Sequence, residues 1–295
     1  MQHYPITLVT AYFELEDPGR GRTASDYHAW MANLLPFIRW PMVIFCDEQS
    51  VDIIKRLRGG KPAVYCVTSL EEFFVYRYRD ILHAHIAQRW PGISPDCSLI
   101  YHEKANFVRR AIDMNTFGSE MFFWCDIGYF RNNKRQTGFH LSDRIEWPNL
   151  QACRTAFGDK VAFFGITDNS ATCAFPPWMW GGFWGGLIKP LRRFCDTYYD
   201  LLDCCVSIHS STIFRGAAVP KGWGFPAEEA LFYHLRVGNF RHPYTGFRIQ
   251  FADMRVFTED DIHWVRRLKR LKKVPPPPPH DVLSQEFGNP VLLER

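Results

Sequence analysis

The sequence of 295 residues has no long apolar run. Its hydrophobic stretches stay well below the roughly 20 residues that cross a bilayer, and its N-terminus lacks the basic and apolar regions of a secretory signal. The net charge of +4 is too small to indicate a general nucleic-acid-binding surface. We therefore expect a soluble, cytoplasmic protein that is not exported and does not bind nucleic acid.

Several signatures of cofactor binding and catalysis are also absent. The nine cysteines form no CxxC pair and no zinc-type spacing, and there is no GxGxxG opening a helix after the first strand, no GxxxxGK[ST] and no GxSxG. These absences argue against dehydrogenases with a dinucleotide fingerprint and against P-loop kinases, and they favour reduced thiols. Side chains would have to hold a phosphate-bearing ligand, and the candidates are Arg20, Arg22 and Lys104. The alternative is that these side chains are simply solvated.

Hydrophobic residues make up 46% of the chain and aromatic residues 16%, which is enough for a large core. Buried strands are predicted at residues 6–13, 42–46, 63–67 and 121–126. Helices are predicted between them at residues 25–37, 51–57, 70–88 and 103–112. This alternation predicts an α/β fold with a mainly parallel sheet flanked by helices on both faces.

Polar side chains follow three of these strands. In an open α/β sheet, ligands bind at the carboxyl ends of the strands, so Thr10, Tyr12, Asp47 and Asp126 are candidate ligand contacts. Asp126 is the most informative because it ends an unbroken apolar run and is placed to hold a divalent cation or a ribose hydroxyl. The alternative is that Asp126 caps the following loop or pairs with an arginine such as Arg131.

The segment 178–186, WMWGGFWGG, combines glycine and tryptophan. Glycine lets a backbone approach a ligand closely, and tryptophan offers flat faces for stacking on sugar rings. The segment therefore predicts a loop at a substrate pocket, with Trp180, Gly181, Gly182 and Trp184 as contacts. The alternative is a tight turn with its tryptophans in the core.

Two adjacent carboxylates, Glu228 and Glu229, open a predicted helix. Acidic residues are favoured at a helix N-terminus by the helix dipole alone. A general base near a reacting hydroxyl must also be a carboxylate or a histidine, and the chain has few better-placed candidates. The pair is therefore a candidate catalytic group.

Residues 262–273 predict a C-terminal helix with one apolar and one basic side. Such a helix docks on the domain with its basic side solvated, or attaches to an anionic membrane surface as a peripheral contact. The prolines at 275–279 predict a polyproline II spacer. We expect one domain over residues 1–274, with a nucleotide-binding half at 1–130 and an acceptor-side half at 131–274, followed by a spacer and tail at 275–295.

The order of several motifs resembles the HtrL/YibB-type family of glycosyltransferase-like proteins. The motifs are ITLVTAYF, YHAWM, PMVIFCD, EKANFVRRAI, FFWCDIGYFR, GGFWGG and EEALF, and the resemblance runs from about residue 6 to residue 235. It implies a GT-A-like, Rossmann-like transferase fold. Asp126 would then occupy the place of the acidic motif that binds Mn²⁺ or Mg²⁺. Gly128 stands where a second carboxylate would be expected.

The resemblance implies a transferase that moves a sugar from a nucleotide-diphosphate donor to a hydroxyl group of a glycan or glycolipid. In that scheme Thr10, Tyr12, Arg22 and Asp47 contact the nucleotide, and Lys104 contacts the diphosphate or the sugar. The GGFWGG segment forms the acceptor-side wall, and Glu228 or Glu229 acts at the reaction centre. Two alternatives stay open: a nucleotidyltransferase that makes the nucleotide sugar, and a non-catalytic sugar-binding protein with a degenerate transferase fold.

Overall fold

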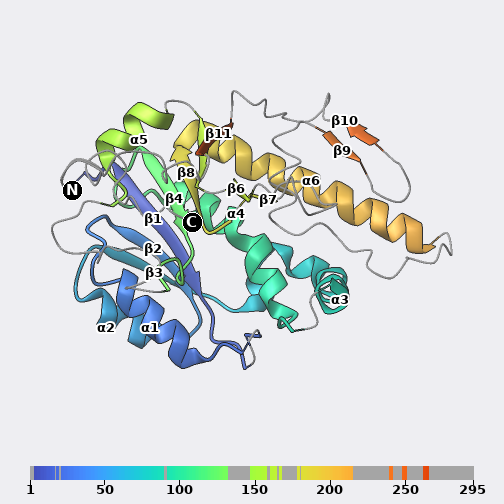
Figure 1. Cartoon of the computed structure of the whole chain (residues 1–295), viewed down its shortest axis with the longest axis horizontal. Coiled ribbons are helices and arrows are strands. Elements are labelled where there is room, and N and C mark those ends of the chain that lie inside the picture. Colours follow the sequence, from blue (N-terminus) through green and yellow to red (C-terminus); the bar gives the residue numbers. More distant parts are fainter. Residues whose placement is uncertain are drawn as a thin grey trace, which may run out of the picture.

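The structure is a computed structural model whose largest element is a seven-stranded sheet with the order β11-β5-β8-β4-β1-β2-β3 (Figure 1). Only β8 runs antiparallel to its neighbours in this sheet, while the other neighbouring strands pair in parallel. The described residues are 3–16, 18–19, 21–89, 92–131, 147–157, 160–164, 166–167, 178–179, 181–214, 239–241, 248–250 and 262–265. The predicted α/β fold with a mainly parallel sheet is therefore confirmed.

The first half of the chain builds strand and helix in alternation. Its elements are β1 (Ile6–Tyr12), α1 (Ala24–Leu34), β2 (Met42–Cys46), α2 (Val51–Arg58) and β3 (Ala63–Val67). Helix α1 begins after Thr23, whose side chain accepts a hydrogen bond from the Asp26 backbone while Asp26 returns one, a capping box. The helix predicted at residues 25–37 is therefore confirmed, although it already begins at Ala24 and ends at Leu34.

The middle of the chain differs from the prediction. Residues 70–88 were predicted as one helix, but they form the short 3₁₀ segments η1 (Leu70–Glu72) and η2 (Phe74–Tyr78) followed by α3 (Arg79–Arg89). Phe73 breaks the helix because its backbone is extended, with φ −68° and ψ 142°. The next helix, α4 (Asp96–Met114), is longer than predicted and leads into β4 (Met121–Cys125).

The second half supplies the antiparallel strand and the longest helix. Its elements are α5 (Leu150–Phe157), β5 (Val161–Phe164), β6 (Ile166–Thr167), β7 (Trp178–Met179), β8 (Phe183–Leu187), α6 (Ile188–Phe214), β9 (Asn239–Arg241), β10 (Arg248–Gln250) and β11 (Ile262–Val265). Strand β8 lies between β4 and β5, so the prediction of a loop over all of residues 178–186 is wrong. A Cβ atom added at Gly185 would lie 2.2 Å from the Phe122 carbonyl oxygen, so the glycine there permits close packing of β8 on β4.

The predicted basic helix at residues 262–273 is also wrong in its first part. Ile262–Val265 form β11, which pairs in parallel with β5 through the register Ile262 to Val161. The apolar residues of this segment recur at helical spacing, but hydrogen bonding to β5 stabilises the first four residues as a strand. The basic residues that follow, and the tail at 275–295, lie outside the described residues. Within the described part of the chain, no helix is long and apolar enough to cross a membrane.

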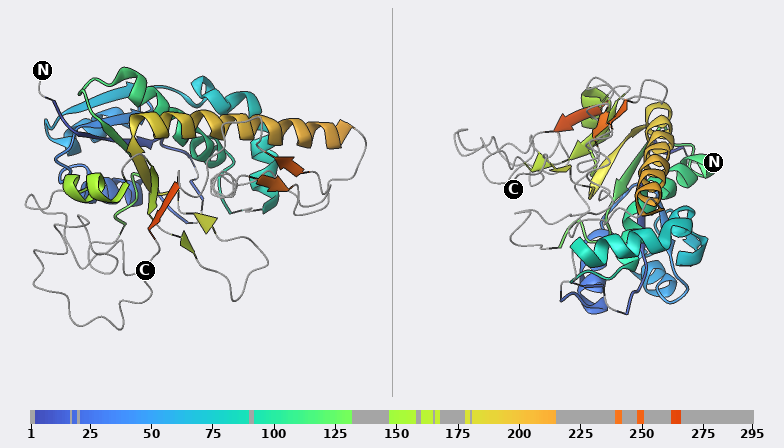
Figure 2. Two further views of the ribbon diagram at one scale, coloured as in Figure 1. Left: turned by 90° about the horizontal axis from the view of Figure 1, so that it is seen from above. Right: turned by 90° about the vertical axis from the view of Figure 1, so that its right-hand side faces the viewer.

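Two hydrophobic clusters fill the two faces of the sheet. One joins the strands to α4, α6 and the 3₁₀ segments, and includes Phe107, Trp124 and Tyr198. The other joins the opposite face to α1, α2 and α5, and includes Leu34 and Ile54. Figure 2 shows α6 running along one side of the sheet and extending beyond it. The helices thus sandwich the sheet and leave its carboxyl edge open between α1 and α4.

Candidate active site

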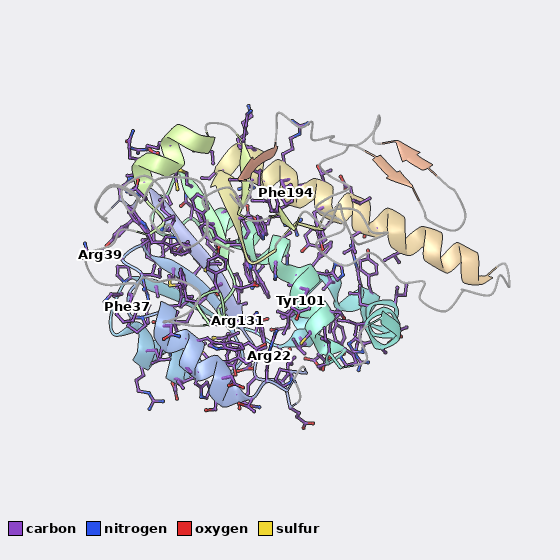
Figure 3. The ribbon with its side chains drawn as sticks, viewed as in Figure 1. Arg22, Phe37, Arg39, Tyr101, Arg131 and Phe194 are labelled. Atoms are coloured by element: carbon purple, nitrogen blue, oxygen red, sulfur yellow. The ribbon has the colours of Figure 1, made fainter. Side chains whose placement is uncertain are left out.

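A pocket of about 280 Å³ lies at the carboxyl ends of β1 and β4. From β1 the chain continues through α1 to β2 on one side, whereas β4 pairs with β1 on the other side and is reached through α4. Because α1 and α4 cover opposite faces, a crevice opens between the two strands. This is a topological switch point, the usual ligand site of open α/β sheets. In Figure 3, Arg22, Tyr101 and Arg131, which all line the pocket, are labelled near one another in this region.

The centre of the pocket is an ion pair between Lys104 on α4 and Asp126 at the end of β4. The Lys104 Nζ atom lies 3.0 Å from Asp126 Oδ1, and the two side chains are 6% and 31% exposed. Asp126 Oδ1 also accepts a hydrogen bond of 2.8 Å from Trp124 Nε1. Lys104 donates a longer one, of 3.3 Å, to the Gly181 carbonyl oxygen. Asp126 therefore pairs with Lys104 and not with Arg131, the arginine considered from the sequence.

Aromatic rings hold the Lys104 ammonium from the sides. Its Nζ atom lies 5.3 Å from the ring centre of Tyr101 and 5.6 Å from that of Trp124. A cation over such rings is attracted by their negative faces. The buried ammonium is therefore stabilised by Asp126, a carbonyl oxygen and two rings, and it points into the pocket.

Two arginines at the pocket wall share one tryptophan. The guanidinium carbons of Arg22 and Arg131 lie 5.8 and 4.9 Å from the ring centre of Trp30. Arg131 Nε donates a hydrogen bond to the Gly128 carbonyl oxygen. Within the described part of the chain, no ion pair joins either arginine to a carboxylate. Two like charges held close together, with no carboxylate within ion-pair distance among the described residues, favour an anionic ligand.

The pKa of Arg131 is lowered in this pocket. Although part of its side chain reaches solvent, packing around the guanidinium removes hydration and lowers the pKa of Arg131. The positive charge of Arg22 lowers that pKa further, while Asp126 opposes the shift. Arginine stays charged at neutral pH in any case. Among the residues that the structure describes, the pocket wall thus carries three cations, Arg22, Lys104 and Arg131, and one carboxylate, Asp126.

Tyrosine rings form the remaining polar wall. Tyr12, at the end of β1, and Tyr101, on α4, both line the pocket. Burial raises the pKa of both hydroxyls, and the nearby carboxylates of Glu14 and Asp47 raise that of Tyr12 further. Both hydroxyls therefore stay protonated at neutral pH and act as neutral hydrogen-bonding groups.

Gly128 lines the pocket two residues after Asp126. A Cβ atom added at Gly128 would lie 2.8 Å from Cε3 of Trp30, closer than side-chain atoms approach one another. The ring that lies beside Arg22 and Arg131 therefore occupies the space that a second acidic side chain would need. Trp30 gives a physical reason for the glycine at this position.

The predicted metal site at Asp126 is not complete among the described residues. No group of three His, Cys, Asp or Glu side chains comes together there, and Oδ1 of Asp126 is already engaged by Lys104 and Trp124. Mn²⁺ and Mg²⁺ take about six oxygen ligands, so a cation at Asp126 would need further oxygens from water, from a bound diphosphate or from residues outside the described ones. Bound metal stays a prediction, because Glu228 and Glu229 lie outside the described residues.

The structure brings most predicted nucleotide and acceptor contacts together. The predicted site residues that line the pocket are Tyr12, Arg22, Lys104, Asp126, Gly128, Gly181 and Gly182. Gly182 lies beside Asp126, since its carbonyl oxygen accepts a hydrogen bond of 2.8 Å from the Asp126 backbone N–H. Trp180, Arg20, Glu228 and Glu229 lie outside the described residues.

Three predicted contacts lie elsewhere. Thr10 is fully buried in the middle of β1, because its position is two residues before the strand end. Asp47 uses both carboxylate oxygens on backbone N–H groups, those of Glu14 and Ser50, and thereby ties the ends of β1 and β2. Trp184 is fully buried in β8 among core aromatic residues. Thr10, Asp47 and Trp184 are thus not among the residues that line the pocket, and ligand contacts for them stay predictions.

Arg131 is the pocket residue whose role the sequence analysis missed. It was named only as a candidate partner of Asp126, whereas the structure places it beside Arg22 on Trp30. Its position five residues after Asp126, in the loop that follows β4, was the available signal, because loops at that edge carry ligand contacts.

Fold and site together define an α/β protein with a cationic pocket at a topological switch point. Residues 74–151, which contain Lys104, Asp126 and Arg131, match the model of the HtrL_YibB family, described as a bacterial protein of unknown function. Over 162 residues the chain is 24% identical to protein HtrL of Escherichia coli (strain K12), covering 46% of this chain and 55% of that protein. The chain thus spans about half the length of this curated relative. The predicted resemblance to the HtrL/YibB family is confirmed.

Two solved structures show remote similarity. One is a 4-diphosphocytidyl-2C-methyl-D-erythritol synthase from Anaerococcus prevotii, with a TM-score of 0.36, 9% identity and coverage of 97% of both chains. The other is mouse xyloside xylosyltransferase 1 in its apo form, with a TM-score of 0.38, 10% identity and coverage of 90% of this chain and 84% of that one. Similarity at this level assigns neither activity to the chain.

Proposed function

We propose that the protein is a glycosyltransferase that moves a sugar from a nucleotide-diphosphate donor to a hydroxyl group of a glycan or glycolipid. The observation that carries the proposal is the excess of positive charge in a pocket at the switch point, where the described lining residues include Arg22, Lys104 and Arg131 and one carboxylate, Asp126. A diphosphate would supply the missing negative charge. Arginine is well suited to it, because the guanidinium fork matches two phosphate oxygens.

The proposed reaction breaks the bond between the anomeric carbon of the sugar and a diphosphate oxygen, and the diphosphate leaves with the electron pair. The acceptor oxygen forms the new bond to the anomeric carbon, and its proton passes to a carboxylate. Charge develops on the leaving diphosphate, so cations fixed beside it lower the barrier. Lys104 is the best placed of them, because its neighbours hold it rigidly.

The other roles follow from the shape of the pocket. Tyr12 and Tyr27 lie with their rings 5.4 Å apart on the α1 side and offer faces on which a nucleobase would stack. Gly181 and Gly182 on the β8 side would let the sugar approach the backbone. The proton acceptor is assigned to Glu228 or Glu229 from the sequence, and the acceptor class likewise stays a proposal.

The proposal is tested with a panel of nucleotide sugars. The protein is incubated with uridine, guanosine, adenosine and thymidine diphosphate sugars, each with Mn²⁺, Mg²⁺ or EDTA, and release of free nucleoside diphosphate is measured. We expect slow hydrolysis of one donor, lost in Lys104→Ala and kept in Arg39→Ala, whose exposed side chain is labelled away from the pocket in Figure 3.

Two outcomes would contradict the proposal. The first is that no donor is hydrolysed and no nucleoside diphosphate binds. The second is that the protein instead joins a nucleoside triphosphate to a sugar phosphate with release of pyrophosphate, which would make it a nucleotidyltransferase. The EDTA arm separately decides whether a divalent cation takes part.

A further inference from the structure

The hydroxyl group of Tyr199 bridges a backbone step of α4. Tyr199 lies on α6 and is 3% exposed. Its hydroxyl donates a hydrogen bond of 2.9 Å to the His102 carbonyl oxygen and accepts one of 2.8 Å from the Asn106 backbone N–H. In an α-helix the carbonyl of residue 102 and the N–H of residue 106 normally bond each other. A side chain from another helix therefore enters the hydrogen-bond ladder of α4 at this turn.

This turn of α4 is the one that carries Lys104. The side chains of two residues next to Lys104 have partners on other elements. The Glu103 carboxylate accepts hydrogen bonds from the backbone N–H groups of Phe74 and Val75 in η2. His102 Nδ1 lies 2.7 Å from the Tyr198 hydroxyl. Within this turn, Lys104 is the residue whose side chain lines the pocket.

We propose that Tyr199 is a positioning residue for Lys104. By bridging residues 102 and 106, its hydroxyl fixes the local shape of the turn and so directs the Lys104 ammonium onto Asp126 Oδ1. Site groups act well only when their own geometry is locked by a supporting layer of contacts. Tyr199 reaches Lys104 only through the α4 backbone, so it touches no ligand. That Lys104 is a ligand-binding group rests on the proposed function.

The conservative change Tyr199→Phe tests the inference cleanly. It removes one oxygen atom and leaves the buried ring in place. The His102 carbonyl and the Asn106 N–H can then bond each other directly, so no buried polar group is left without a partner. We expect the protein to stay folded, with the turn relaxed toward regular helix and Lys104 shifted away from Asp126.

The readout is the reactivity of Lys104 itself. Acetic anhydride acetylates exposed lysines, and mass spectrometry of the peptides compares Lys104 with Lys55, an exposed lysine on α2. In the unchanged protein we expect Lys104 to react about tenfold more slowly than Lys55, because it is buried and paired. Tyr199→Phe should raise the relative rate of Lys104 several-fold.

Tyr198→Phe is the matched control. It removes one hydroxyl from the adjacent residue of the same helix, and that hydroxyl lies 2.7 Å from the side-chain Nδ1 atom of His102. We expect it to leave Lys104 reactivity within twofold of the original. Glu103→Gln is a second variant that loosens the same turn from the η2 side, and it should raise Lys104 reactivity.

An unchanged Lys104 rate in folded Tyr199→Phe would overturn the inference, and so would an equal rise in Tyr198→Phe. Titration with inorganic pyrophosphate separates this result from the proposed function. Weaker pyrophosphate binding in Tyr199→Phe than in Tyr198→Phe supports both. If the unchanged protein binds no pyrophosphate, the diphosphate role fails, while the acetylation result still decides whether Tyr199 positions Lys104.

Discussion

The Lys104 ammonium lies 3.0 Å from the Asp126 carboxylate, and the pair joins α4 to the carboxyl end of β4. Helix α4 leads directly into β4, so the two residues come from consecutive elements on one side of the crevice at the switch point. An ion pair this shielded from water is held by the carbonyl oxygen and rings around it as much as by its own attraction. The pocket beside it keeps Arg22 and Arg131 available for an anion.

Replacing either arginine by alanine should weaken pyrophosphate binding. Each guanidinium makes charge-assisted hydrogen bonds to phosphate oxygens, so we expect Arg22→Ala and Arg131→Ala each to raise the Kd about tenfold, or about 1.4 kcal/mol. Arg39→Ala is the control, because Arg39 is exposed and outside the pocket lining. Isothermal titration at two salt concentrations measures the effect. Equal affinities in all three variants would remove the arginines from the site.

Asp126→Asn should lower stability and tighten anion binding at the same time. The change leaves the ammonium of Lys104, which is 6% exposed, without its carboxylate, and we expect the free energy of unfolding to fall by about 2 kcal/mol. Without divalent cations, pyrophosphate should bind more tightly because one negative charge has gone. Urea unfolding and titration measure the two effects.

Asp113→Asn is the matched control for this change. Asp113 pairs with Arg192 at 2.7 Å, but both side chains are about half exposed. Water and salt screen such a pair, so its loss should cost less than about 1 kcal/mol and leave anion binding unchanged. An equal fall in the free energy of unfolding in Asp126→Asn and Asp113→Asn would show that burial of the Lys104–Asp126 pair does not contribute to stability.

Gly128→Ala should disturb Trp30 and the arginines beside it. The new Cβ atom would lie 2.8 Å from the Trp30 ring, and relief of such overpacking costs about 1–3 kcal/mol. Gly92→Ala is the control, since no atom lies within 4 Å of its added Cβ. Thermal unfolding and tryptophan fluorescence are the measurements. An unchanged melting temperature in Gly128→Ala would show that Trp30 leaves room for a side chain.

The free energy of unfolding should fall as the pH rises, because Glu103 loses its proton. Burial raises the pKa of Glu103 from 4.5 to about 7, although hydrogen bonds from Asn106 and from the Phe74 and Val75 backbone oppose the shift. Because the folded pKa is higher than the unfolded one, this stability is full below pH 4.5 and is lost as the pH rises to about 7. It amounts to about 3 kcal/mol.

Glu103→Gln should remove that part of the pH dependence. Urea unfolding between pH 5 and 8 compares it with Glu120→Gln, a change at an exposed carboxylate that pairs with Arg154 at the surface. We expect the slope to persist in Glu120→Gln and to flatten in Glu103→Gln. The same slope in both variants would assign the pH dependence to other groups.

The sequence predicted the parallel part of the sheet because its strands are continuous apolar runs. Met42–Cys46 and Ala63–Val67 match the predicted strands residue for residue. The alternation of strands and helices along the chain predicted a ligand crevice at the carboxyl edge of the sheet. That prediction placed Lys104 and Asp126 in the same crevice. In these segments the local sequence pattern and the tertiary contacts favour the same conformation, so the strands could be predicted from the sequence.

Prediction failed where pairing partners decide the conformation. The glycines of 181–186 indicated a loop, but Gly185 permits β8 to pack tightly on β4, and Trp184 then enters the core. Ile262–Val265 have helical spacing with the residues after them, yet they pair with β5 as a strand. The bridge from Tyr199 to α4 joins residues more than 90 positions apart, and no local signal reveals it.

Titration of the protein with nucleoside diphosphates tests the central claim most directly. If the pocket holds the diphosphate of a nucleotide sugar, at least one of uridine, guanosine, adenosine and thymidine diphosphate should bind with a Kd of about micromolar order. Lys104→Ala should weaken that binding at least about tenfold, because it removes the fixed cation at the centre of the pocket. Absence of binding by all four nucleotides, or binding that survives unchanged in Lys104→Ala, would contradict the claim.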